Sequence, residues 1–234
     1  MERLIVVGGD GTVHLAIQHL AETPVAMTVL PHGTGNDVHR ALLEANLVGG
    51  SSGQGETAID LLRVTSDTGV RWVASIVIAG FPAAVNARAN ASSLPIGKWI
   101  YTLAAVRELA QMRRVPLSGA IDGDELDLDT AMLAIGSTAY FGGGMLACPD
   151  ALPDDGAVHL TSIEGVGPLG LIPHLVQKSG GSAGRSEVLR RKGCRVTLET
   201  PGIDLYGDGE FVGKTPATIE LIPGALRLGA MVGH

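Results

Sequence analysis

The first forty residues contain two glycine-rich turns, Gly8-Gly9-Asp10-Gly11-Thr12 and Gly33-Thr34-Gly35-Asn36-Asp37. Each turn follows a short apolar run, residues 4–7 in the first case and 26–30 in the second, and each is followed by apolar residues at helical spacing. A short apolar strand, a glycine turn and a helix make up the repeating unit of a parallel α/β sheet. Because ligands bind beyond the carboxyl ends of such strands, both turns are expected to face one crevice.

The residue types in these turns favour a phosphate ligand. Glycines allow backbone N–H groups to approach an anion closely, and the N-terminus of a following helix adds unpaired donors and the positive end of its dipole. The turns match neither the phosphate loop that ends in Gly-Lys-Ser/Thr nor the dinucleotide pattern Gly-x-Gly-x-x-Gly. An alternative for Thr12 and Asp37 is a role as helix N-caps. Because two such turns follow successive strands, we interpret the pair as a nucleotide site.

Composition sets limits on the class of protein. The chain has 234 residues, of which 45% are hydrophobic, so it is long and apolar enough to form a sizeable core. The net charge of −7 argues against a broad surface for nucleic acid, and no such partner is expected. Two cysteines, Cys148 and Cys194, form no disulfide framework and suit a reduced, cytoplasmic setting. No apolar run reaches the length of a membrane-spanning helix.

The pattern changes from helices to strands beyond the second turn. Residues 70–78 are predicted to form one strand and residues 94–114 a helix. Beyond Val115, short strands alternate with turns that contain Gly, Asp and Pro. The predicted fold class is therefore α/β plus β. A parallel α/β nucleotide-binding domain covers residues 1–62, and an antiparallel, β-sandwich-like domain covers residues 63–234.

Charged runs in the second domain have structural interpretations. Asp122-Gly123 and Asp208-Gly209 each separate two β-rich stretches, and an Asp-Gly pair is a strong signal for a tight hairpin. A basic run is formed by Arg185, Arg190, Arg191, Lys192 and Arg195. Such runs are usually solvated surface, and contact with phospholipid headgroups is the alternative.

Six stretches together carry a resemblance to a known family. They are Gly8–Thr12, Pro31–Asp37, Asn86-Ala87-Arg88-Ala89-Asn90, Tyr140-Phe141-Gly142-Gly143-Gly144-Met145, Asp208-Gly209-Glu210 and Pro223-Gly224-Ala225-Leu226-Arg227. In this order they resemble the catalytic domain of the diacylglycerol kinase and lipid kinase family, particularly its bacterial members. NAD kinases and phosphofructokinases share the Gly-Gly-Asp-Gly turn. The second turn and the late Asp-Gly-Glu are what favour lipid kinases.

The resemblance implies transfer of the γ-phosphate of ATP, with Mg²⁺, to a lipid hydroxyl, most simply that of diacylglycerol. In this family the glutamate of Asp-Gly-Glu takes the proton from the lipid hydroxyl, so Glu210 is the expected general base. The resemblance also assigns a catalytic role to Asp10, as part of the network that binds the nucleotide and the metal ion. The implied nucleotide-binding set is Gly8, Gly9, Asp10, Gly11, Thr12, Gly33, Thr34, Gly35, Asn36, Asp37 and Asp60. From the sequence alone, Asp37 also reads as a helix cap and Asp60 as a charge at the edge of a strand.

The resemblance also implies a second cation site, in the turn Asp154-Asp155-Gly156. The equivalent turn in the family holds a structural Mg²⁺ with an aspartate and backbone carbonyls. Here Asp155 is expected to supply the carboxylate, and Leu152 and Ala157 the carbonyl groups. The alternative is a plain turn without a metal ion.

The start of the chain differs from the family pattern. Family members carry a strand–helix lead with an Asn-Pro turn before this point, so we expect the first domain to be truncated and one edge of its sheet to be exposed. We also expect the last strand of the chain to pack back on the first domain. Pairing through that edge would give a homodimer. The alternatives to a diacylglycerol kinase are a non-catalytic nucleotide- or lipid-binding remnant and a kinase for a sphingoid base or NAD. A lipid substrate implies a protein that binds peripherally to the membrane surface.

Overall fold

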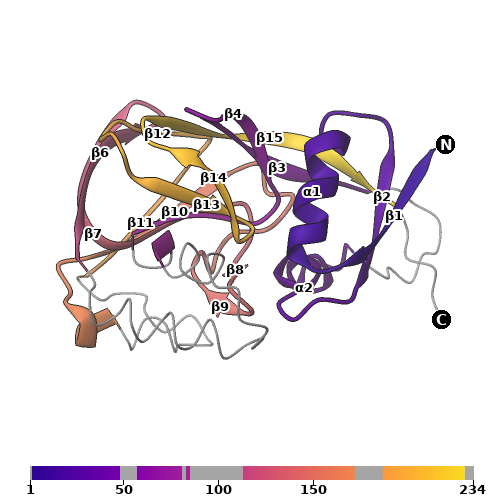
Figure 1. Ribbon diagram of the computed structural model, residues 1–234, viewed down its shortest axis with the longest axis horizontal. Helices are drawn as coiled ribbons and strands as arrows, with labels where there is room; N and C mark the ends of the chain where they lie inside the picture. Colours follow the sequence, from indigo (N-terminus) through magenta and orange to yellow (C-terminus); the bar gives the residue numbers. More distant parts are fainter. Residues whose placement is uncertain (1, 48–56, 81–82, 85–112, 172–186, 230–234) are drawn as a thin grey trace.

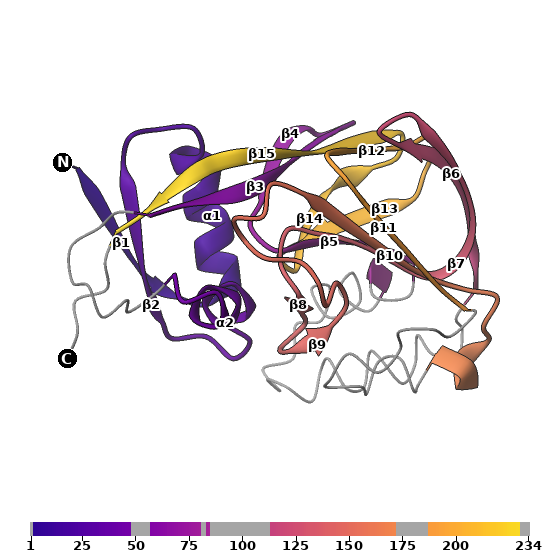
Figure 2. The same cartoon turned by 180° about the vertical axis from the view of Figure 1, so that it is seen from behind.

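The computed structural model describes residues 2–47, 57–80, 83–84, 113–171 and 187–229. Figure 1 shows two lobes: a small lobe in which two helices lie against strands, and a larger lobe made of strands. The view from behind shows the same division, with two long strands running from one lobe to the other (Figure 2). The elements are β1 (Arg3–Gly8), α1 (Asp10–Leu20), β2 (Ala26–Pro31), α2 (Asp37–Glu44), β3 (Thr57–Ser66), β4 (Gly69–Val73), β5 (Ile76–Gly80), β6 (Val115–Ile121), β7 (Asp124–Gly136), β8 (Tyr140–Phe141), β9 (Met145–Leu146), β10 (Val158–Glu164), β11 (Val188–Gly193), β12 (Arg195–Leu198), β13 (Asp204–Gly207), β14 (Glu210–Lys214) and β15 (Ala217–Leu228).

The first lobe is built on parallel strands. β1 pairs with β2 along its whole length, and β2 pairs in parallel with the end of β15, where Met27 lies opposite Leu228. The last strand of the described chain therefore belongs to the sheet of the first lobe. The buried core of this lobe contains Val6, Val13, Ile17, Leu20, Met27, Val29, Val38, Leu42, Ile59, Leu61, Ala74, Ala225, Leu226 and Leu228. The helical spacing of Val13, Ile17 and Leu20 explains why α1 buries that face.

The second lobe is an antiparallel sheet that folds around its own apolar core. β6 and β7 form a hairpin, β7 pairs also with β5 and β10, and β5 continues to the β13–β14 hairpin. Alternate residues of these strands face inward, as period-two patterning requires. The core includes Leu117, Leu126, Leu128, Leu133, Ile135, Val158, Leu160, Val196, Leu205, Val212 and Ile219. The predicted fold class, an α/β lobe followed by an antiparallel β lobe, is confirmed.

The two long strands β3 and β15 contribute to both cores. Leu61 of β3 is buried in the first lobe, and its neighbour Leu62 is buried in the second. The pairing of β15 with β3 is irregular between Ile222 and Leu226. Residues of β15 before this point are buried in the second lobe, and residues after it are buried in the first. The boundary predicted at residue 62 falls inside β3, so the lobes share a continuous pair of strands.

The strand predicted over residues 70–78 is divided in the structure. β4 ends at Val73 and β5 begins at Ile76, with a bend at Ala74 and Ser75. The backbone N–H groups of both bend residues donate to the carboxylate of Asp208, at 3.0 and 2.9 Å. A continuous strand was the wrong prediction because these donors bind a side chain from β13–β14 rather than a neighbouring strand.

Some sequence predictions fall outside the described residues. The stretch Asn86–Asn90 and residues 94–112 of the predicted helix lie there. Residues 168–171, at the end of one described range, are helical. Among the helices of the described ranges, none is long and apolar enough to cross a membrane.

Candidate active site

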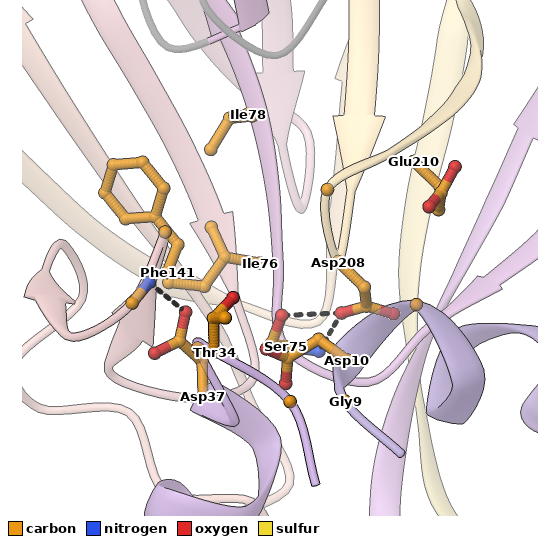
Figure 3. Close-up of a pocket in the computed structure, with 16 residues that line it drawn as sticks. Gly9, Asp10, Thr34, Asp37, Ser75, Ile76, Ile78, Phe141, Asp208 and Glu210 are labelled. Carbon is orange, nitrogen blue, oxygen red and sulfur yellow. Dashed lines mark hydrogen bonds between the residues drawn. The ribbon is translucent and has the colours of Figure 1, made fainter. Parts of the chain in front are cut away.

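A cleft of about 520 Å³ lies between the lobes (Figure 3). The first lobe contributes both glycine turns, and the second contributes β5, the turn after β8 and the β13–β14 hairpin. The lining residues are Gly9, Asp10, Gly11, Gly33, Thr34, Gly35, Asp37, Ser75, Ile76, Ile78, Phe141, Gly142, Gly143, Asp208, Gly209 and Glu210. Of the predicted nucleotide set, Gly8, Thr12, Asn36 and Asp60 do not line this cleft. The two turns that were expected to share a crevice do share one.

The two glycine turns touch each other through their backbones. A Cβ placed on Gly9 would lie 2.9 Å from the Cα of Gly33, closer than real Cβ contacts allow. The second turn is closed by the Asn36 side chain, which accepts from the N–H of Gly33 at 3.0 Å and donates to its carbonyl at 2.9 Å. Asn36 itself has a φ of 54°, a left-handed conformation that asparagine tolerates better than most residues. Glycine is required here because no side chain fits between the turns.

Thr12 and Asp37 are not the N-cap residues of the two helices, because each lies inside its helix. α1 begins at Asp10 with Gly9 as its cap, and α2 begins at Asp37 with Asn36 as its cap, in each case without a side-chain cap hydrogen bond. The carboxylate of Asp10 instead accepts from the backbone N–H of Val38 at 3.2 Å, in the first turn of α2. Asp10 therefore ties the first glycine turn to the helix that follows the second.

Asp37 connects the first lobe to the second. One of its carboxylate oxygens accepts from the N–H of Gly143 at 2.7 Å (Figure 3), and the other lies 2.8 Å from the guanidinium of Arg40. Burial raises the pKa of Asp37 above its ordinary value of 3.8, although the Gly143 N–H opposes this, and the charge of Asp10 raises the pKa further. The two aspartates therefore repel each other across the end of the cleft.

Asp208 is a functional-site residue that sequence reasoning did not select. Its side chain is fully buried and accepts hydrogen bonds from the N–H groups of Ala74 and Ser75 and from the Ser75 hydroxyl (Figure 3), while Nδ1 of His14 lies 3.0 Å away. The predicted Asp-Gly hairpin is present, with φ of 52° at Asp208 and 89° at Gly209. The turn signal was correct, but it gave no indication that the aspartate carboxylate would bind two other segments.

Glu210 lies at the edge of the cleft, at the start of β14. Its side chain is on the exposed part of the hairpin, and its Oε1 would be 3.3 Å from a Cβ placed on Gly11. The carboxylate therefore stands directly over the first glycine turn. The cleft also has an apolar wall, formed by Ile76, Ile78 and Phe141. These three side chains lie away from Glu210 in Figure 3. The cleft thus combines a glycine-lined end beside the start of α1, a carboxylate and an apolar wall.

Asp60 has a different position from the rest of the predicted nucleotide set. It is buried, its N–H donates to the carbonyl of Pro153, and its carboxylate accepts from the N–H groups of Gly156 and Gly224 at 2.9 and 2.8 Å. Both oxygens are therefore engaged in holding the 153–156 turn against β3 and β15. In this arrangement Asp60 supports the junction of the lobes without lining the cleft.

The turn at Asp155 was predicted to hold a second metal ion. One carboxylate oxygen of Asp155 lies 2.8 Å from Nε2 of His159 and 3.1 Å from Nζ of Lys192, and the other accepts from the N–H of Ala157 at 3.1 Å. The carbonyl of Leu152 accepts from the Asp155 N–H at 3.3 Å. Lys192 and His159 therefore engage one oxygen of the carboxylate that would bind the cation, and the metal site in this turn stays a prediction. No group of three or more His, Cys, Asp or Glu in the described residues is arranged to hold one.

Comparison with known proteins finds two matching families. A family described as the diacylglycerol kinase catalytic domain matches residues 1–71, and one described as the YegS C-terminal NAD kinase beta sandwich-like domain matches residues 75–230. A diacylglycerol kinase of Mycobacterium tuberculosis is 34% identical over 240 residues, which cover 97% of this chain and 76% of that protein. A probable lipid kinase YegS-like of Stenotrophomonas maltophilia is 28% identical and covers 98% of this chain and 79% of that protein.

A solved structure shows the same fold. A diacylglycerol kinase from Bacillus anthracis superposes with a TM-score of 0.70 at 18% identity, over 97% of this chain and 75% of that one. The matched families together define a kinase whose second lobe is of the NAD kinase beta sandwich-like type. More specifically, the chain belongs to the diacylglycerol kinase and YegS-like lipid kinase family. It is a lipid kinase, and its family implies ATP as the phosphate donor.

Proposed function

We propose that this lipid kinase transfers the γ-phosphate of ATP to the free hydroxyl of diacylglycerol, which yields phosphatidic acid and ADP. The relatives named diacylglycerol kinase and the apolar wall of the cleft support this acceptor. The observation that carries the proposal is the position of Glu210 over Gly11, since it sets a carboxylate beside the turn that would hold the phosphates. Because diacylglycerol resides in a bilayer, the enzyme would act while bound to the membrane surface.

In this proposal the glycine turns hold the phosphate chain of the nucleotide. Gly9, Gly11, Gly33 and Gly35 line the cleft without side chains, so their backbone can approach phosphate oxygens closely. The N-terminus of α1 adds the positive end of its dipole beside these glycines. The apolar wall of Ile76, Ile78 and Phe141 would receive the acceptor lipid.

Asp10 and Asp37 fit a divalent cation that arrives with the nucleotide. Burial raises the pKa of Asp37 and the charge of Asp10 raises it further, and a cation between the two carboxylates and the phosphates would relieve their repulsion. Mg²⁺ is usually bound through one or two carboxylates together with substrate phosphates and water. When bound, the cation would offset negative charge on the phosphates. We assign this role first to Asp10, because Asp37 is already bound to Gly143 and Arg40.

Glu210 would act as the general base. As the lipid oxygen attacks the γ-phosphorus, the carboxylate accepts the hydroxyl proton and the bond to the β–γ bridging oxygen breaks. Positioning of the base depends on the hairpin, because the neighbouring Asp208 is fixed by Ala74, Ser75 and His14. A positioned base contributes about 10²–10⁴-fold to such a reaction.

The test is transfer of labelled phosphate from ATP to diacylglycerol in mixed micelles, with sphingosine and NAD offered in parallel. We compare the wild type with Glu210→Gln and with the matched control Glu125→Gln, at the exposed tip of the β6–β7 hairpin. We expect Glu210→Gln to lose at least about 10²-fold in kcat and Glu125→Gln to behave as the wild type, with diacylglycerol the preferred acceptor. Full activity of Glu210→Gln would show that Glu210 is not the general base. Preference for sphingosine or NAD would show that diacylglycerol is not the acceptor.

A further inference from the structure

A second groove, of about 210 Å³, lies in the larger lobe and shares no lining residue with the cleft. It is formed by the β10–β11 ribbon and the segment after β9, and both views show β10 and β11 side by side (Figures 1 and 2). The lining residues are Cys148, Pro149, Asp150, His159, Leu160, Thr161, Arg190, Arg191 and Lys192. Three residues of the basic run noted in the sequence, Arg190, Arg191 and Lys192, therefore line a concave surface.

The register of the ribbon places four polar side chains on one face. His159 lies opposite Lys192 and Thr161 lies opposite Arg190, and alternate residues of a strand point to the same side. Leu160, between them, is buried in the core on the other side. Arg190 and Lys192 thus bring two positive charges to the same face as the Thr161 hydroxyl.

Arg190 has an unmet hydrogen-bonding requirement. Its Nε is buried and has no hydrogen-bond partner, and no ion pair of Arg190 occurs within the described residues. Lys192 differs, because its ammonium lies 3.1 Å from Asp155, which also binds His159. Buried donors in native proteins nearly always have a partner, and a guanidinium N–H is a particularly costly one to leave unpaired. The groove therefore presents an unused cationic donor.

The other groups of the groove favour an anion or are neutral toward it. Burial raises the pKa of the Cys148 thiol to about 12, so the thiol stays protonated and adds no negative charge at neutral pH. The carboxylate of Asp155 forms an ion pair with Lys192 and a hydrogen bond with His159. Asp150 is exposed at the rim, where solvent screens its charge.

We propose that this groove binds a phosphate group, with Arg190 as the principal contact and Lys192 and Thr161 beside it. The planar guanidinium matches the geometry of phosphate oxygens, and the binding is charge-assisted. The phosphate could belong to free inorganic phosphate or to the headgroup of an anionic phospholipid. The site is independent of the proposed kinase chemistry, because it lies outside the cleft.

The first experiment measures binding of inorganic phosphate by calorimetry, with a non-hydrolysable ATP analogue present to fill the cleft. We expect Arg190→Gln to weaken phosphate binding about tenfold or more. Arg190→Lys should give intermediate affinity, because lysine keeps the positive charge but lacks the planar guanidinium group that matches phosphate oxygens. Arg71→Gln, which removes the same charge from an exposed position on the edge strand β4, should bind as the wild type. Thermal unfolding of each variant confirms that it is folded.

The second experiment identifies the source of the phosphate by co-sedimentation with vesicles. Phosphatidylcholine vesicles are compared with vesicles that also contain phosphatidic acid. Loss of sedimentation in Arg190→Gln but not in Arg71→Gln supports a lipid headgroup, and unchanged sedimentation together with lost phosphate binding supports free phosphate. If neither phosphate nor vesicle binding depends on Arg190, the proposal is wrong and the basic residues serve only to protect an edge strand from pairing.

Discussion

Nδ1 of His14 lies 3.0 Å from Oδ2 of Asp208, and both side chains are buried. This contact joins the first lobe, where His14 lies on the helix that starts at the glycine turn, to the second lobe, where Asp208 lies two residues before Glu210. Asp208 also fixes the bend between β4 and β5. The two ends of the proposed reaction, the phosphate turn and the base, are therefore positioned by one buried carboxylate.

Asp208→Asn should impair both stability and catalysis. The amide cannot accept from all of the donors that now face the carboxylate, and an unsatisfied buried group reduces the free energy of unfolding by about 1–3 kcal/mol. We expect kcat to fall about tenfold or more because Glu210 loses its support, with a smaller change in the KM for ATP. Urea unfolding and steady-state kinetics measure the two effects.

Asp122→Asn is the matched control for that variant. Asp122 occupies the same position in a hairpin of the same kind, with φ of 50°, and its carboxylate accepts from the N–H groups of Cys194 and Arg195. It lies far from the cleft lining, so kcat should be unchanged. A similar loss of kcat in both variants would show that Asp208 acts on general stability rather than on the base.

Gly33→Ala should weaken ATP binding. A methyl group at this position overlaps the backbone of Gly9 and lies 2.8 Å from the side-chain oxygen of Asn36, so the two turns must separate. We expect the Kd for ATP to rise about tenfold, which corresponds to about 1.4 kcal/mol. Gly167→Ala is the control, because open space surrounds that position. Equal ATP affinity in Gly33→Ala and the wild type would contradict a phosphate site between the turns.

The raised pKa of Asp37 predicts a pH dependence of stability. In the folded protein this carboxyl holds its proton to a higher pH than its unfolded value of 3.8, mainly because it is buried. Its contribution to stability is therefore fully present below pH 3.8 and is lost as the pH rises through the folded pKa. The free energy of unfolding of the wild type minus that of Asp37→Asn should decrease across this interval. A difference that is flat or that increases with pH would contradict a raised pKa of Asp37 in the folded protein.

The cluster at Asp155 predicts a limited response to divalent cations. Because Lys192 and His159 already bind its carboxylate, Mg²⁺ should raise the Tm of the wild type and of Asp155→Asn by the same amount. The substitution itself should destabilise the protein by about 1–2 kcal/mol, chiefly through the buried contact with His159, since exposed pairs contribute little. A Mg²⁺-dependent rise in Tm that requires Asp155 would instead support a metal site in this turn.

Local patterns were enough to predict much of the fold. The apolar runs before each glycine turn specified β1 and β2, and Asp122-Gly123 specified the β6–β7 hairpin, because these features depend on nearby residues. The division of residues 70–78 into β4 and β5 was missed. It depends on Asp208, which is more than 130 positions away along the chain.

The candidate site was predictable to a similar extent. The shared crevice of the glycine turns follows from parallel topology, which the sequence pattern indicates. The contacts of Asp208, His14 and Ser75 do not follow from it, because each depends on how the second lobe docks on the first. Asp155 was assigned by resemblance, and the resemblance carried no information about Lys192, which reaches it from β11.

Because β3 and β15 pass through both lobes, we expect neither lobe to fold autonomously. Expression of residues 1–71 alone would remove β15, which pairs with both β2 and β3. Ile59 and Leu61 would then lose the packing that Leu226 and Leu228 provide in the shared core. A fragment of this kind should be poorly soluble, whereas unfolding of the full chain should proceed as a single cooperative transition.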